Sequence, residues 1–184
     1  MGRFDDAVSE YGGCLDRGIG EADVGSMPSV GDPRQCVVVA RDPASRVALT
    51  AWLVRALARA GRRREAQEQL EALPSTWPGG LGPSALYPGS PIVPDDNVHY
   101  WALLRYYRGD VDQRSIVDAA RGGEQFPTVA YGVAAWALAF GEEASARRLL
   151  EEIVADSHWA RLGHVAAEAD LVRLADESGR EDIA

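Results

Sequence analysis

The stretch DPASRVALTAWLVRALARAGRRREAQEQLEAL, residues 42–73, decides the fold class because it encodes a complete pair of helices. Asp42 is a good N-cap, and Pro43 suits the first helical turn, where its missing N–H costs no hydrogen bond. From there to Ala60 the polar residues keep to one narrow stripe, so we expect a helix that neighbours nearly enclose. Gly61 ends this helix, and a charged helix with one apolar face follows it. The stretch therefore predicts an antiparallel helical hairpin.

The same design recurs towards the end of the chain, in residues 127–155. No charged residue stands between Pro127 and Gly141, which predicts an interior helix, and an amphipathic helix follows at once. A weaker pair of helices turns at Gly109. The predicted organisation is one domain over residues 1–184, with a lone second helix at 3–17, a loop at 18–41, hairpins at 42–73, 95–120 and 127–155, a Pro/Gly-rich loop at 74–94, and a closing helix at 157–176. In the closing helix, the residues expected to face inward are Leu162, Ala166, Ala169 and Val172.

Strand signals are confined to QCVVVA, residues 35–40, which stands alone between two Asp-Pro pairs. An isolated strand has no pairing partner, so we expect an extended or helical stretch packed on the helices. The fold class predicted from the sequence is therefore all-α, with turns at Gly61, Gly109 and Gly141 and no sheet of three or more strands.

Composition narrows the range of partners. The formal net charge is −9, which argues against a nucleic-acid partner because affinity for the phosphate backbone depends on cationic contacts. No apolar run approaches the roughly 18 residues of a membrane-spanning helix, and no signal segment opens the chain. Cys14 and Cys36 are too few for a disulfide framework, so we expect two ordinary thiols and a cytoplasmic location.

The hairpins resemble the tetratricopeptide repeat, whose pattern runs W-x2-L-G-x2-Y, then A-x3-F, then P. The matching residues of the first hairpin are Leu53, Val54, Leu57, Ala66, Leu70 and Pro78, and those of the last hairpin are Val133, Ala134, Ala137, Ala146 and Leu150. No hairpin has Trp at the leading position, and the turn glycines are unevenly spaced. The resemblance, to divergent repeats of a bacterial type, implies a short right-handed solenoid of antiparallel hairpins with long loops.

The opening residues fit this pattern only as the second helix of a hairpin. Gly2 stands at the turn, Ala7 at the small contact position and Tyr11 at the large one. We therefore expect the chain to begin inside a repeat. Phe4, Ala7, Val8 and Tyr11 would pack on the hairpin after Pro43, and upstream residues or self-association through this helix would cover the apolar strip that remains.

The resemblance also implies that the first helix of each hairpin lines a concave groove. The residues that this places inside the groove are Arg55, Arg59, His99, Tyr106, Tyr107 and Tyr131. Arginine binds carboxylates through two donors and tyrosine offers rigid contact area, a composition typical of binding hot spots. The function expected is therefore a non-enzymatic scaffold that binds a peptide or protein segment.

Metal and catalytic motifs are weak by comparison. His158 and His164 lack a helical metal spacing, no H-E-x-x-H, G-x-S-x-G or G-K-[ST] occurs, and no cofactor is expected. The basic run at residues 62–65 is interpreted as a solvated turn. The alternative function is a small enzyme or small-molecule binder in which the 74–94 loop forms a lid and His99 acts as an acid–base group together with Asp95 or Asp96.

Overall fold

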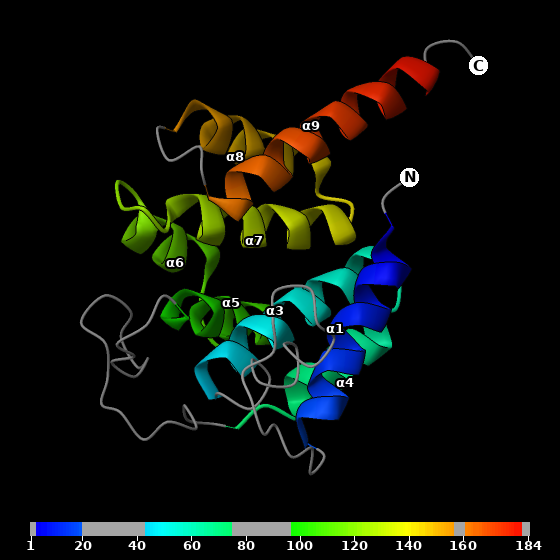
Figure 1. Ribbon diagram of the computed structural model, residues 1–184. Helices are drawn as coiled ribbons and strands as arrows, with labels where there is room; N and C mark the ends of the chain where they lie inside the picture. Colours follow the sequence, from blue (N-terminus) through cyan, green and yellow to red (C-terminus); the bar gives the residue numbers. More distant parts are fainter. Residues whose placement is uncertain (1–2, 20–42, 75–96, 157–160, 182–184) are drawn as a thin grey trace, which may run out of the picture. The chain divides into compact units, whose positions relative to one another are not determined.

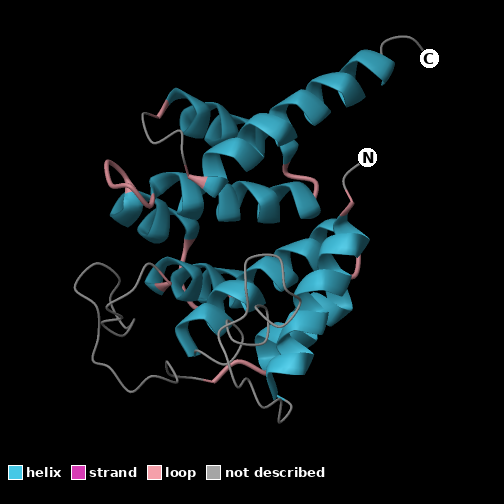
Figure 2. Ribbon diagram, viewed as in Figure 1, coloured by secondary structure: helices cyan, strands magenta, loops and turns pink. Residues whose placement is uncertain are grey.

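The computed structural model describes residues 3–19, 43–74, 97–156 and 161–181. These segments contain helices and turns and no strand, which confirms the all-α class (Figures 1 and 2). The helices are α1 (Phe4–Ile19), α3 (Pro43–Arg59), α4 (Arg63–Glu71), α5 (Val98–Arg108), α6 (Gln113–Ala120), α7 (Phe126–Ala139), α8 (Glu143–Ala155) and α9 (Leu162–Glu181). The stretch at residues 35–40, expected to be extended or helical, lies outside the described residues. Within the described part of the chain, no helix has the length and apolar character needed to cross a membrane.

The chain divides into two compact units, which we describe separately. The N-terminal unit, Arg3–Asp110, contains α1, α3, α4 and α5, and the C-terminal unit, from Val111 onward, contains α6 to α9. The boundary falls between α5 and α6, inside the segment 95–120 that the sequence pairs as a hairpin. The single domain over residues 1–184 stays a prediction.

Helix α3 is the centre of the N-terminal unit, where it contacts α1, α4 and α5. Its alanine, valine and leucine residues leave little polar surface, and Ala51 and Val54 are completely buried. Helix α4 packs on it through Ala66 and Leu70, the two apolar residues that lie one helical turn apart on an otherwise charged helix. Burial of apolar side chains on both sides of α3 is therefore what holds this unit together.

Helix α1 packs on α3 with the face that the sequence indicates. Val8 and Leu15 are buried, whereas Phe4, Ala7 and Tyr11 are partly covered. The Phe4 ring lies under the Arg59 guanidinium, with 4.6 Å between the guanidinium carbon and the ring centroid. The aliphatic stem and cation of an arginine can cover an aromatic ring in this way without burying charge in an apolar core.

The predicted turns at Gly61, Gly109 and Gly141 are confirmed, since their φ angles are 77°, 88° and 81°. These left-handed angles favour glycine, which ends each helix by allowing the chain to reverse. Gly109 is the C-cap residue of α5, and its N–H donates back to the carbonyl of Tyr106. The helix that follows begins at an Asp112 cap.

Helix α7 is the centre of the C-terminal unit, where α6, α8 and α9 contact it. Val129, Val133 and Ala134 are completely buried, as expected for a helix without charged residues. Helix α8 contributes Leu150 and Ile153, which are equally buried, and α9 lies across both α7 and α8 (Figure 1). The interior position predicted for the 127–141 stretch is therefore correct.

The predicted inward face of the closing helix is wrong. Helix α9 runs from Leu162 to Glu181, and residues 157–160, where the predicted helix begins, lie outside the described residues. Leu162 and Val172 are 69% and 63% exposed, and Ala169 is also exposed. The residues buried instead are Gly163, His164, Ala167, Asp170 and Leu174.

A close backbone contact explains this rotation of α9. A Cβ atom at Gly163 would lie 2.2 Å from the carbonyl oxygen of Pro127, so only glycine lets α9 approach α7 here. Tyr131 on α7 then donates a hydrogen bond to Asp170 at 3.3 Å. A buried aspartate with a tyrosine partner is compatible with the core, whereas the sequence pattern favoured the wholly apolar face.

Candidate functional site

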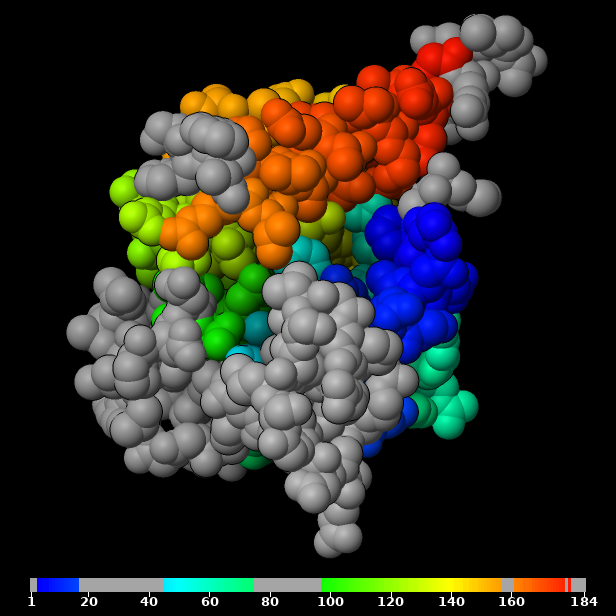
Figure 3. Space-filling model, in the orientation of Figure 1, coloured from blue at the N-terminus to red at the C-terminus, as the bar shows by residue number. Residues whose placement is uncertain are grey.

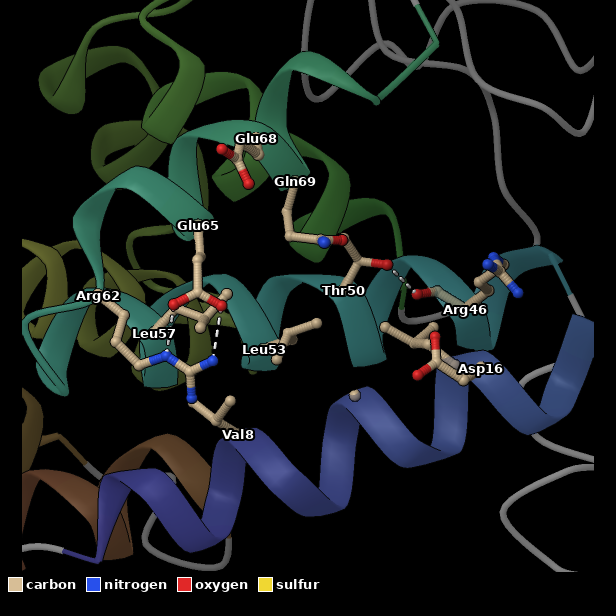
Figure 4. A pocket seen from close by; sticks show the side chains of 12 residues that line it. Val8, Asp16, Arg46, Thr50, Leu53, Leu57, Arg62, Glu65, Glu68 and Gln69 are labelled. Carbon is tan, nitrogen blue, oxygen red and sulfur yellow. Dashed lines mark hydrogen bonds and ion pairs between the residues drawn. The ribbon is translucent and has the colours of Figure 1, made fainter.

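A cavity of about 490 Å³ lies between α1 and α4 in the N-terminal unit, with α3 as its floor (Figure 4). Leu53 and Leu57 of α3 and Val8 and Leu15 of α1 supply its apolar lining. The α4 side and the two ends are polar. The volume falls in the range of small-molecule and peptide side-chain sites.

Helical spacing brings the lining residues together on each helix. On α3, residues 46, 50, 53 and 57 repeat at intervals of four, three and four, and so share one face. On α1 the same periodicity places Val8, Gly12 and Leu15 towards that face. The polar residues Glu65, Glu68 and Gln69 come from α4, and Gln69 extends towards Thr50 of α3 (Figure 4).

Gly12 leaves part of the α1 wall open. A Cβ atom built on Gly12 would meet no atom within 4 Å, although this glycine sits inside a helix and lines the cavity. Glycine weakens a helix interior relative to alanine, so no local helical requirement accounts for it. Its effect is to widen the cavity by the volume of a side chain.

One end of the cavity carries a fixed ion pair. Arg62 donates from Nε and Nη2 to the two carboxylate oxygens of Glu65, at 2.7 and 2.6 Å, and Asp5 Oδ1 lies 3.9 Å from Arg62 Nη1. The hydrogen bonds from Arg62 lower the pKa of Glu65, and those same bonds raise the pKa of Arg62. Glu65 therefore stays ionised at neutral pH and does not serve as a proton donor.

The other end carries Arg46 and Asp16, from α3 and α1 (Figure 4). The Thr50 hydroxyl between the two ends donates to the carbonyl oxygen of Arg46 at 2.8 Å. The described residues that line the cavity include no histidine, cysteine, serine or lysine. An apolar floor between charged ends of both signs is typical of a binding site.

The residues predicted for the concave groove do not line this cavity. Arg55 and Arg59 lie on α3 and His99, Tyr106 and Tyr107 on α5, all in the N-terminal unit, whereas Tyr131 lies on α7 in the other unit. His99 and Tyr107 are buried, and the rings of Tyr106 and Tyr107 lie 5.7 Å apart. The groove built from these six residues stays a prediction.

Arg55 and Arg59, the two arginines predicted for the concave groove, both contact aromatic rings, and the contact of Arg59 with Phe4 is described above. The Arg55 guanidinium carbon lies 3.8 Å from the centroid of the Trp52 ring, and that ring lies 6.3 Å from Tyr11 on α1 and from Tyr100 on α5. Burial raises the pKa of Tyr11, and the positive charge of Arg55 partly opposes this effect. This cluster joins three helices, so it has a structural role in the unit.

The cavity was not predicted from the sequence, because its lining residues do not form a recognisable motif. The basic run at 62–65 is solvated as predicted, since Arg63, Arg64 and Glu65 are exposed, and Arg62 also forms one end of the cavity. The signal that could have been read is Gly12, because a glycine inside a helical pattern costs stability and so indicates a packing or functional reason.

The described residues do not test the enzyme alternative. Among them, no group of three or more histidine, cysteine and acidic residues could hold a metal ion. His158, Asp95, Asp96 and most of the 74–94 loop lie outside the described residues, so the enzyme hypothesis stays a prediction.

Cys14 forms a disulfide bond, and the prediction that it is an ordinary thiol is wrong. The only other cysteine in the sequence, Cys36, lies outside the described residues. Disulfides are rare in the cytosol. The bond therefore weighs against the cytoplasmic location, which stays a prediction.

No family model, curated protein or solved structure matches this chain. The function is therefore inferred from the geometry of the described helices.

Proposed function

We propose that this chain is a non-enzymatic binding protein that holds a peptide or protein segment in the cavity between α1, α3 and α4. The observation that carries this proposal is the combination of an apolar floor with charged ends of both signs. Apolar groups of a partner would contact the edges of Leu53 and Leu57, which are 5% and 3% exposed, while its polar groups would meet Arg46, Asp16 or Gln69. Interfaces are commonly built in this way, with an apolar centre and a polar rim.

The packing of the N-terminal unit supports a short solenoid of the tetratricopeptide type as the scaffold. Helix α3 contacts α1 before it and α4 after it, and α5 contacts both α3 and α4. Consecutive helices that each contact their predecessors are what stacked hairpins require. In this arrangement α1 and α4 are second helices of neighbouring hairpins, and the cavity lies between them above the first helix α3.

Selection from a random peptide library tests the proposal. The library is selected on wild-type protein, and binding of the enriched peptides is measured by fluorescence polarisation against wild type and two variants. Gly12→Phe fills the cavity from the α1 side, whereas Gly12→Ala adds a Cβ that meets no atom. We expect Gly12→Phe to lose at least about tenfold in affinity, roughly 1.4 kcal/mol, and Gly12→Ala to bind as wild type does.

A matched control separates blocking from a general loss of folding. Gly179→Phe places the same ring on α9, at a glycine whose Cβ would also meet no atom, and should leave binding unchanged. Enriched peptides that bind Gly12→Phe as tightly as wild type would show that the cavity is not the binding site.

A further inference from the structure

The outer face of α9 carries an apolar row that the core does not use. Leu162, Val165 and Val172 are 69%, 56% and 63% exposed, and Ala169 between them is exposed as well. In the space-filling view α9, coloured orange to red, lies at the surface (Figure 3). We call these four residues the α9 row.

The geometry of the α9 row is that of a helix–helix seam. With 100° per residue, the row lies opposite the face of Ala167, Asp170 and Leu174, which packs on α7 and α8. Its spacings of three, four and three residues match the a and d positions of a two-helix contact. A row of apolar side chains exposed on a helix surface is typical of a contact with a partner.

Charged residues on the two borders of the α9 row complement each other. Glu168, whose side chain is 57% exposed, lies on one border, and Arg173 lies on the other border five residues later. When two such helices run parallel, a residue at the Glu168 position of one lies beside the residue five positions later on the other. Two copies of α9 would thus form two Glu168–Arg173 pairs, one on each side of the seam.

We propose that a second copy of this chain covers the α9 row, with the two α9 helices parallel about a two-fold axis. Each residue of the α9 row then meets its own counterpart, and the small Ala169 at the centre lets the helices approach closely. Arg173 keeps its hydrogen bond to Asp170, at 2.8 Å, and exchanges its contact with Glu177, at 3.5 Å, for the Glu168 carboxylate of the second copy. This contact is independent of the cavity between α1, α3 and α4.

Light scattering of the full chain across a concentration series tests the contact. We expect wild type to approach twice the 19.8 kDa mass of one chain as concentration rises. Val165→Glu and, separately, Val172→Glu should remain at the mass of one chain, because each places two carboxylates against each other at the seam. Ala144→Glu, at an exposed position of α8, is the matched control and should associate as wild type does.

Circular dichroism melts of the same variants show whether they fold. We expect them to fold, because the substituted side chains are exposed. A wild-type chain that stays at 19.8 kDa at every concentration overturns the proposal. Association that persists in both glutamate variants also overturns it, since the chains would then meet elsewhere, for example through α1.

Cross-linking tests the parallel orientation. In a parallel pair the Ala169→Cys variant brings two thiols together across the two-fold axis, so mild oxidation should give a covalent dimer. Ala144→Cys, the control on α8, should not cross-link. A non-covalent dimer in which Ala169→Cys fails to cross-link overturns the parallel arrangement.

Discussion

Gly12 and Gly163 are both helical glycines, yet their surroundings give them opposite roles. A Cβ on Gly12 meets nothing within 4 Å, while a Cβ on Gly163 would lie 2.2 Å from the Pro127 carbonyl oxygen. At Gly12 the glycine opens a cavity, and at Gly163 it permits close packing of two helices. Nothing in the local sequence distinguishes the two, because the difference depends on which helix lies opposite.

Alanine at these glycines should therefore change stability in opposite directions. Gly12→Ala should raise the free energy of unfolding by about 0.5–1 kcal/mol, because alanine loses less backbone entropy in a helix. Gly163→Ala should lower the free energy of unfolding, since the new methyl group forces α9 away from α7. Urea denaturation measures both, and a stabilising Gly163→Ala would contradict the packing of α9.

Asp112 predicts a pH-dependent contribution to stability. The hydroxyl and backbone N–H of Ser115 donate to its carboxylate and lower its pKa, so the ionised form is favoured in the folded state. A carboxylate with a lowered folded pKa stabilises the protein above the pKa of the unfolded state, near 4, and loses this effect as the pH falls through the folded pKa.

Asp112→Ala should accordingly lower the melting temperature at neutral pH. The difference from wild type should shrink as the pH falls well below about 4, where both forms lack an ionised cap. Thermal melts at the two pH values measure this, with Glu151→Ala on α8 as an exposed control. A difference that is equal at both pH values would show that Asp112 does not act through its charge.

At the scale of helices, the second helix of each recognised hairpin has a completely buried leucine. Leu70 of α4 and Leu150 of α8 are both completely buried. Replacing either by alanine should cost about 2–5 kcal/mol, because the removed methyl groups leave a cavity that the surrounding helices fill only in part. Chemical denaturation measures the loss, and Gln67→Ala, on the exposed side of α4, should change stability little. A loss under about 0.5 kcal/mol at Leu70 or Leu150 would contradict the packing described.

The helices whose burial could be predicted are those whose sequence is compatible with only one environment. The stretch from Pro127 to Gly141 has no charged residue, so α7 could only be internal. Two different faces of α9 could have been buried. The face that is buried contains His164 and Asp170, whereas the apolar pattern in the sequence favoured the other face. The partners that make a buried polar residue acceptable come from other helices, as Tyr131 does for Asp170, and periodicity within one helix does not reveal them.

At the scale of the whole molecule, the fold class was readable from the sequence and the candidate site was not. Hairpin repetition and turn glycines predict a helical protein, and the described residues agree. The cavity depends on the gap between α1 and α4, which are far apart in the sequence, and on the absence of a side chain at Gly12. A tertiary gap of this kind leaves no periodic signal.

The Cys14 disulfide gives a prediction for the intact chain. Thiol labelling of the denatured protein should detect no free cysteine before reduction and both cysteines after it. Reduction should lower the free energy of unfolding by about 2–4 kcal/mol, because the cross-link restricts the unfolded chain. Cys14→Ser should show the stability of the reduced protein with or without reductant. Labelling of both thiols without a reductant would contradict the bond.

We expect a partner to bind in the cavity between α1, α3 and α4, and an NMR titration of labelled protein with a library-selected peptide tests this expectation. The largest backbone shift changes should fall on the residues that line the cavity, among them Gly12, Leu53, Leu57 and Gln69. Shift changes centred on Arg55, Arg59 and His99 instead, with the cavity residues unmoved, would contradict it.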